Sequence, residues 1–187
     1  MLLEGVIACD DGRVAKLGEG FTIVLCIAWS YEYGPIDGLT SKVRVDGLDA
    51  SSQIASLVSM LKRSIQPEAL LLDSLTIAGF NVVSPSTIKK LAGIPTIVIY
   101  TYKPSLDRLK SALMNNFKDW NIRLKILSII NEAWHMTVDG EELYVVSWGL
   151  EINRVKEIVS SLILYSRKPE PLRLAHYLAS EISRILF

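Results

Sequence analysis

Several aspartates in this sequence come directly after apolar stretches, where a buried strand would end. Asp10 follows Gly-Val-Ile-Ala-Cys, Asp46 follows Lys-Val-Arg-Val, and Asp73 follows Ala-Leu-Leu-Leu. An ionised carboxylate that is buried without a partner costs several kcal/mol, so a group of them requires cations. If the strands are neighbours in one sheet, these side chains converge on a hard divalent ion, Mg²⁺ or Mn²⁺, with oxygen ligands.

Each aspartate also has an ordinary structural interpretation. Asp11 and Asp46 each precede a glycine, and Asp-Gly is among the commonest turn dipeptides. Asp49 is well suited to cap the helix that follows it, which explains that residue without a metal. Asp46 has no capping role that would explain it. Asp73 could also cap a helix or turn the chain, but it ends a strand expected at the centre of the sheet and is the sharpest ligand candidate.

Basic side chains near other strand and helix ends could complete such a site. Lys103 follows a strand expected at 94–101, where its ammonium would suit a phosphate oxygen, although taken alone it is an ordinary solvated lysine. His176 lies three residues after Arg173, so both project from one face of the final helix. The sequence has no Gly-rich phosphate loop, Gly-x-Ser-x-Gly elbow or His-Glu-x-x-His motif. Walker-type nucleotide hydrolysis, serine hydrolysis and zincin chemistry are therefore disfavoured.

The hydrophobic pattern predicts the sheet that must position these residues. Three strands joined by short connections come first and indicate an antiparallel meander: 4–10, 21–30 and 36–45. A helix beginning at Asp49 follows. Apolar strands then alternate with helical segments, which predicts parallel pairing; the strands are 69–73 and 94–101, and the helices 84–92 and 105–117. An antiparallel start followed by parallel β-α units, flanked by helices, is the order of the α/β ribonuclease H-like fold.

The second half of the chain is expected to be mostly helical. Helices are expected at 121–130 and 151–164, and between them a hairpin at 133–147 that turns on Asp139-Gly140. A last helix follows Pro169-Glu170-Pro171, since proline suits the first turn of a helix. No internal repeat, low-complexity stretch or linker divides the sequence, so residues 1–187 are expected to form one domain.

Composition bounds the partners and the compartment. The 187 residues carry 20 Lys and Arg against 20 Asp and Glu, so the formal net charge is zero. A protein that coats duplex nucleic acid is usually basic, so this balance disfavours a pure nucleic-acid-binding module but not an enzyme that contacts nucleic acid through a local patch. No signal peptide is visible, and the longest apolar runs fall short of the ~18 residues of a membrane span. We expect a cytoplasmic protein without membrane contact.

The two cysteines, Cys9 and Cys26, lie in the first two predicted strands. Without a Cys-x-x-Cys or histidine spacing they do not make a zinc site. The favoured interpretation is a pair of buried thiols in a reducing compartment. The alternative is a cross-strand disulfide, as found in intracellular proteins of hyperthermophiles.

Four ordered blocks of sequence are distinctive: Asp10-Asp11-Gly12, Val45-Asp46-Gly47-Leu48-Asp49-Ala50, Leu72-Asp73-Ser74 through Ala78-Gly79-Phe80-Asn81-Val82-Val83, and Pro169-Glu170-Pro171-Leu172-Arg173-Leu174-Ala175-His176. Together they resemble an archaeal family known as domain of unknown function number 99, a distant relative of endonuclease V. The resemblance spans nearly the whole chain. It implies a ribonuclease H-like fold and cleavage of a phosphodiester near a deaminated base, with Mg²⁺ or Mn²⁺ held by acidic residues.

The resemblance also implies roles by position. Asp10 and Asp73 match two of the metal-binding acids of endonuclease V, and Lys103 matches its lysine after the fifth strand. The segment that ends at His176 matches its closing Pro-x-x-x-Arg-x-Ala motif, which here includes Arg173.

The match has departures. The middle glutamate of the relatives has no counterpart, so Asp46 or Asp49 must replace it with a side chain one methylene shorter. Ser74 stands where glycine is usual. The histidine of the same block is missing, with Asn81 nearby.

The acids and the resemblance together predict a metal-dependent endonuclease acting on nucleic acid that contains deaminated bases, DNA in preference to RNA. The metal ligands would be Asp10, Asp73 and Asp46 or Asp49; catalysis would add Lys103 and His176, and substrate contacts Asn81 and Arg173. Two other classes stay open: a non-catalytic nucleic-acid-binding relative, and a metal-dependent phosphohydrolase of small nucleotides.

Overall fold

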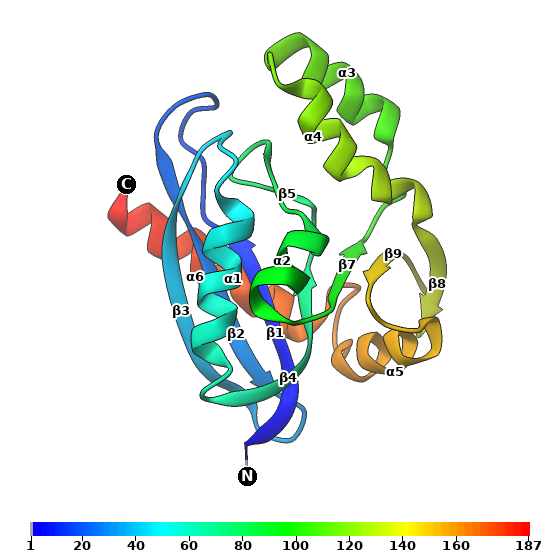
Figure 1. Cartoon of the computed structure of the whole chain (residues 1–187). Coiled ribbons are helices and arrows are strands. Elements are labelled where there is room, and N and C mark those ends of the chain that lie inside the picture. The colour runs from blue at the N-terminus through cyan, green and yellow to red at the C-terminus, as the bar shows by residue number, and fades with distance from the viewer. Residues whose placement is uncertain (1) are drawn as a thin grey trace.

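The computed structural model describes residues 2–187 and shows a seven-stranded mixed sheet with helices on both faces (Figure 1). The strands lie in the order β3-β2-β1-β4-β7-β9-β8. Their bounds are β1 Leu3–Asp11, β2 Phe21–Ser30, β3 Gly34–Arg44, β4 Ile65–Leu72, β7 Thr96–Tyr100, β8 Trp134–Val138 and β9 Glu141–Trp148.

Strand directions explain where a site can form. β1, β2 and β3 make an antiparallel meander, and β1–β4 and β4–β7 are parallel pairs. The predicted antiparallel start followed by parallel β-α units is therefore confirmed. Because β1, β4 and β7 point the same way, their carboxyl ends meet at one edge of the sheet, where ligands bind in open α/β sheets.

Helices cover both faces. Their bounds are α1 Ala50–Leu61, α2 Pro85–Ala92, α3 Leu106–Asn116, α4 Trp120–Leu127, the 3₁₀ helix η1 Ser128–Glu132, α5 Ile152–Leu162 and α6 Glu170–Leu186. α1 and α2 pack on one face, whereas α5 and α6 pack on the other (Figure 1). Within residues 2–187 no helix combines the length and apolarity that crossing a membrane requires.

Alternation along the central strands assigns side chains to two cores. In β1, Ile7 and Cys9 belong to the core under α1, whereas Val6 and Ala8 belong to the core under α5. In β4, Leu70 and Leu72 face α1, whereas Ala69 and Leu71 face α5. A residue that follows either strand inherits the same alternation.

Two local features differ from the sequence prediction. The stretch after Asp73 forms a small hairpin, β5 Thr76–Ile77 and β6 Asn81–Val82, which its irregular pattern did not indicate. The helix expected at 121–130 ends as an α-helix at Leu127 and continues as η1. The hairpin expected to turn on Asp139-Gly140 does form, with positive φ at both residues, and its strand β9 extends the sheet by pairing with β7.

The prediction of two free thiols is wrong, because Cys9 and Cys26 form a disulfide. The two residues stand directly opposite each other in the β1–β2 ladder, with their Cα atoms 4.1 Å apart. Directly opposed residues of an antiparallel pair project from the same face, so the two sulfur atoms meet. This register could not be read from the sequence.

Candidate metal centre

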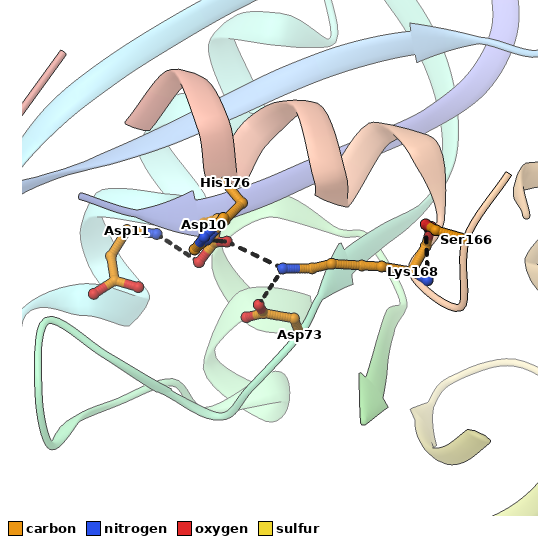
Figure 2. Close-up of polar contacts among 6 residues, drawn as sticks. All are labelled: Asp10, Asp11, Asp73, Ser166, Lys168 and His176. Atoms are coloured by element: carbon orange, nitrogen blue, oxygen red, sulfur yellow. Dashed lines mark hydrogen bonds and ion pairs between the residues drawn. The ribbon is translucent and has the colours of Figure 1, made fainter. Parts of the chain in front are cut away.

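Strand alternation brings Asp10 and Asp73 to the same face of the sheet. Asp10 continues the β1 side chains that face α5, and Asp73 continues the corresponding side chains of β4. Both lie at the carboxyl ends of neighbouring parallel strands. With His176 they form a group whose ligand atoms all lie within 4.8 Å of one another (Figure 2).

Helix α6 delivers the histidine. The prolines at 169 and 171 suit its first turn, and its apolar side chains Ala175 and Ala179 pack on β2. On the adjoining face of the helix, His176 Nδ1 lies 2.9 Å from Asp10 Oδ2. Asp10 is almost fully buried, whereas about half of the His176 side chain is exposed. The histidine therefore connects a buried carboxylate to the solvent side of the site.

Lys168, which the sequence analysis did not single out, completes the cluster. Its Nζ donates to Asp73 Oδ2 at 2.6 Å and lies 3.5 Å from Asp10 Oδ2 (Figure 2). The residue sits in the bend before α6, where Ser166 Oγ donates to its carbonyl oxygen and accepts from its N–H. The signal in the sequence is weak: a basic residue just before Pro169.

Electrostatics explains why a cation is needed here. Burial raises the pKa of Asp10, and the neighbouring charge of Asp73 raises it further, against the lowering effect of Lys168. Burial would lower the pKa of Lys168, but Asp73 and Asp10 outweigh that effect and raise it. The lysine ammonium thus stabilises the ionised forms of two carboxylates that would otherwise repel each other.

The two carboxylates also fit a divalent cation. They already share one positive group, the ammonium of Lys168, and their ligand oxygens lie within 4.8 Å of each other, a separation that a single ion can bridge. Carboxylate oxygens are the ligands that Mg²⁺ and Mn²⁺ prefer. The residues are therefore chemically suited to hold a metal.

Asp11 points to the opposite face from Asp10. Its Oδ2 accepts a hydrogen bond from the Ala78 N–H at 2.6 Å, which fastens the β5–β6 hairpin to the end of β1. Burial, followed by the charge of Asp10, raises the pKa of Asp11 to about 7. Asp11 is therefore a structural anchor that carries an electrostatic penalty when ionised.

Replacing Asp11 with Asn is expected to remove part of the pH dependence of stability. Between about pH 4 and pH 7 the folded protein holds a proton on Asp11 that the unfolded chain has released, so the free energy of unfolding falls as pH rises through this window. Asn can still accept from the Ala78 N–H. Urea unfolding in EDTA, at about pH 5 and about pH 8, should show Asp11→Asn less sensitive to pH and more stable than the wild type at the higher value.

The exposed Asp107→Asn variant is the control and should follow the wild-type curve. If the free energy of unfolding changed equally with pH in the wild type and in Asp11→Asn, the raised pKa of Asp11 would be contradicted. Any slope that remains in Asp11→Asn is attributed to Asp10, whose pKa is raised as well.

Asp46 and Asp49, predicted as alternatives for the middle ligand, do not join the cluster. Asp46 Oδ1 accepts from the Phe80 N–H and its Oδ2 from the Gly18 N–H, both at 2.6 Å. Asp49 Oδ1 accepts from Asn81 Nδ2 at 2.6 Å. Among residues 2–187 the only group of three potential ligands is the one formed by Asp10, Asp73 and His176. The two other carboxylates instead tie loops together.

Asn81, predicted to contact substrate, is fully buried. Its amide donates to the Arg44 carbonyl at 2.8 Å and its side-chain oxygen accepts from the Ala50 N–H at 3.0 Å. The latter bond satisfies an N–H in the first turn of α1. In this structure Asn81 is thus a connector between α1, β3 and β6.

Lys103 and Arg173 lie near the site but outside the cluster. Lys103 is exposed and lines a cavity of about 330 Å³ that begins at Ser74, next to Asp73. Tyr100, Tyr102 and Arg108 also line it. Arg173 lies one turn before His176 and pairs with Glu170 through its Nε at 2.9 Å.

Arg123, a residue without any signal in the sequence analysis, holds the neighbouring loops. The residue is 4% exposed, and its guanidinium donates to the carbonyl oxygens of Asp46, Gly47 and Phe80 at 2.9, 2.9 and 2.7 Å. Its Nε donates to Asp119 at 3.0 Å. One side chain of α4 therefore fixes the β3–α1 loop and the β5–β6 hairpin.

Comparison with known sequences places nearly the whole chain in one family. A sequence model described as Endonuclease dU matches residues 5–183. The UPF0215 protein of Aeropyrum pernix is 46% identical over 182 residues, which cover 95% of this chain and 97% of that protein. The similarity thus extends over the sheet and over all residues of the cluster.

Comparison with solved structures shows the fold. A protein of unknown function from Archaeoglobus fulgidus has a TM-score of 0.80 at 24% identity, covering 95% of this chain and 96% of that one. Endonuclease V of Ciona intestinalis, in complex with a 24mer DNA that contains an inosine followed by a ribo-adenosine, has a TM-score of 0.64 at 13% identity, covering 97% and 86%. The chain therefore shares its fold with both of these proteins.

Proposed function

Because the chain belongs to the Endonuclease dU family, we propose that it is a metal-dependent endonuclease that cuts nucleic acid near a deaminated base, with DNA as the preferred substrate. The observation that carries this proposal is the group of Asp10, Asp73 and His176 at the shared carboxyl edge of two parallel strands. The fold shared with endonuclease V supports it.

Asp10 and Asp73 would hold the ion, either Mg²⁺ or Mn²⁺. The chemistry that such an ion supplies when bound is Lewis-acid stabilisation of charge on a phosphodiester and activation of water. His176 Nδ1 lies within hydrogen-bonding distance of Asp10 Oδ2, so with Asp10 ionised this nitrogen carries the hydrogen. The other ring nitrogen, Nε2, is then left to exchange a proton with substrate or water.

Two lysines would contact the phosphate. The Lys168 ammonium lies beside the two carboxylates. It would therefore be close enough to form an ion pair with a phosphate bound at the same site. Lys103 stands at the cavity next to Asp73 and would neutralise an oxygen farther along the strand. Tyr100 and Tyr102, in the same cavity, offer aromatic surfaces on which a base can stack.

Replacing His176 with Ala is expected to lower the cleavage rate roughly a hundredfold while metal binding persists, because general acid–base groups typically contribute 10²–10⁴-fold. The measurement is single-turnover nicking of labelled duplex, with Mn²⁺ binding followed in parallel by electron paramagnetic resonance. The neighbouring exposed Tyr177→Ala variant serves as control. A His176→Ala protein that cuts at the wild-type rate would remove the histidine from the mechanism.

The function itself is tested by incubating the protein with labelled oligonucleotides that contain deoxyuridine, deoxyinosine or no lesion, each with Mg²⁺, Mn²⁺ or EDTA. We expect metal-dependent nicking at a lesion and none in EDTA. Binding in EDTA without cleavage under any condition would indicate a non-catalytic relative. Turnover of free nucleotides without nicking would indicate a small-phosphate hydrolase.

A further inference from the structure

Charge is distributed unevenly in this neutral chain. Residues 103–127 contain six Lys or Arg and only two Asp, a net charge of +4, so the rest of the chain carries the compensating −4. We refer to this segment, which comprises α3, α4 and their flanking turns, as the α3–α4 arm. Such segregation creates a local positive potential that the formal net charge of zero conceals.

The basic side chains of the arm are available to a partner. Lys103, Arg108, Lys110, Lys118 and Lys125 are all exposed. Among residues 2–187, none of the five forms a salt bridge. The one ion pair within the arm joins Arg123 to Asp119. Elsewhere many cations are paired, as are those of α6 with Glu170 and Glu181. The arm thus holds a set of like charges without protein counterions.

The arm begins at the edge of the sheet that carries the candidate metal centre. β7 runs parallel to β4, whose carboxyl end leads into Asp73, and α3 starts six residues after β7 ends. The cavity next to Asp73 extends from Ser74 to Arg108 of α3. Figure 1 shows α3 and α4 projecting together beyond the sheet. Two cations of the arm, Lys103 and Arg108, therefore line the cavity next to the site.

We propose that the α3–α4 arm binds the phosphate backbone of the nucleic-acid duplex flanking the cleavage site. This inference rests on the proposed function and extends it. An 11-residue helix such as α3 spans about 17 Å, which is roughly half of the ~34 Å turn of B-form DNA. The arm therefore reaches phosphates about half a helical turn from the bond that is cut, and it contributes affinity without reading the lesion.

The test uses the full-length protein and uncut duplex in EDTA, so that binding is measured apart from cleavage. The triple variant Lys110→Gln/Lys118→Gln/Lys125→Gln removes three arm charges. We expect the affinity for duplex to fall by about tenfold or more relative to the wild type. The slope of log K against log salt should decrease in magnitude by up to about 3, since each phosphate contact contributes ~0.9. The triple Lys→Arg variant keeps the charges and should keep the affinity.

The matched control is Lys42→Gln/Lys156→Gln, two exposed lysines on β3 and α5. It should bind as the wild type does. A second control shortens the duplex on either side of the lesion: removing the arm-bound flank should weaken wild-type binding but not that of the triple variant. Circular dichroism melting verifies that every variant is folded.

The outcomes separate the two proposals. If the wild type nicks lesions but the triple Gln variant binds with unchanged affinity and salt slope, the arm is overturned and the enzyme function stands. If control and arm variants lose affinity equally, the arm is overturned as well. If the wild-type protein nicks lesions but binds no duplex in EDTA, the arm alone is overturned. If it neither nicks nor binds duplex, both proposals fall.

Discussion

Replacing Asp73 with Asn is expected to abolish metal-dependent nicking and to leave the fold intact. Asp73 is about one-quarter exposed, and its contact is with Lys168 rather than with the core, so the change costs little packing. It removes one of the two charges that would hold the ion. Loss of several kcal/mol of electrostatic stabilisation corresponds to a decrease of roughly 10³-fold or more in rate.

Single-turnover nicking with Mn²⁺ measures this effect, and Mn²⁺ binding by electron paramagnetic resonance should weaken with it. Asp49→Asn is an informative companion, because Asp49 was predicted as a ligand but binds Asn81. We expect Asp49→Asn to keep Mn²⁺ affinity even where it lowers stability. Cleavage by Asp73→Asn at the wild-type rate would refute the metal centre.

Replacing Arg123 with Met is expected to lower the free energy of unfolding by about 3–5 kcal/mol, because it removes the donor of three carbonyl oxygens and each buried polar group left unsatisfied costs about 1–3 kcal/mol. Met can fill much of the volume over the Phe117 ring, but it leaves the Asp46, Gly47 and Phe80 carbonyls without their donor. It also leaves the Asp119 carboxylate alone. Urea unfolding measures the difference.

Lys125→Met, on the exposed side of the same helix, controls for the change of residue type and should shift stability by no more than about 0.5 kcal/mol. A change below about 1 kcal/mol for Arg123→Met would show that water replaces the guanidinium readily. Because the same side chain fixes the β5–β6 hairpin, the destabilised variant should also be cleaved by proteases near 76–82 at low urea.

The antiparallel start, the parallel β-α units that follow it and the convergence of Asp10 and Asp73 were predictable for a simple physical reason. Apolar runs mark buried strands, and an aspartate at the end of such a run lies at a sheet edge, as Asp10 and Asp73 do. The resemblance to an endonuclease V-like family is likewise confirmed by the family match. These features depend on local sequence and on the order of the elements alone.

Other parts of the site depend on contacts between distant residues. Lys168 reaches Asp73 across 95 positions of sequence. Asp46 has φ of 55°, an uncommon value for a residue other than glycine, and uses its carboxylate to accept two backbone N–H groups. A carboxylate after a strand satisfies backbone donors as readily as it binds a cation, so composition and spacing could not distinguish Asp46 from Asp10.

The disulfide between Cys9 and Cys26 has a consequence for Asp10, the next residue in β1. Sliding one strand past its neighbour by a single position would exchange inward and outward side chains along its whole length. The covalent bond forbids such slippage between β1 and β2 at the position adjacent to the carboxylate. Asp10 is therefore held on the face that α6 covers, and thermal fraying at the end of the ladder cannot turn it away from His176.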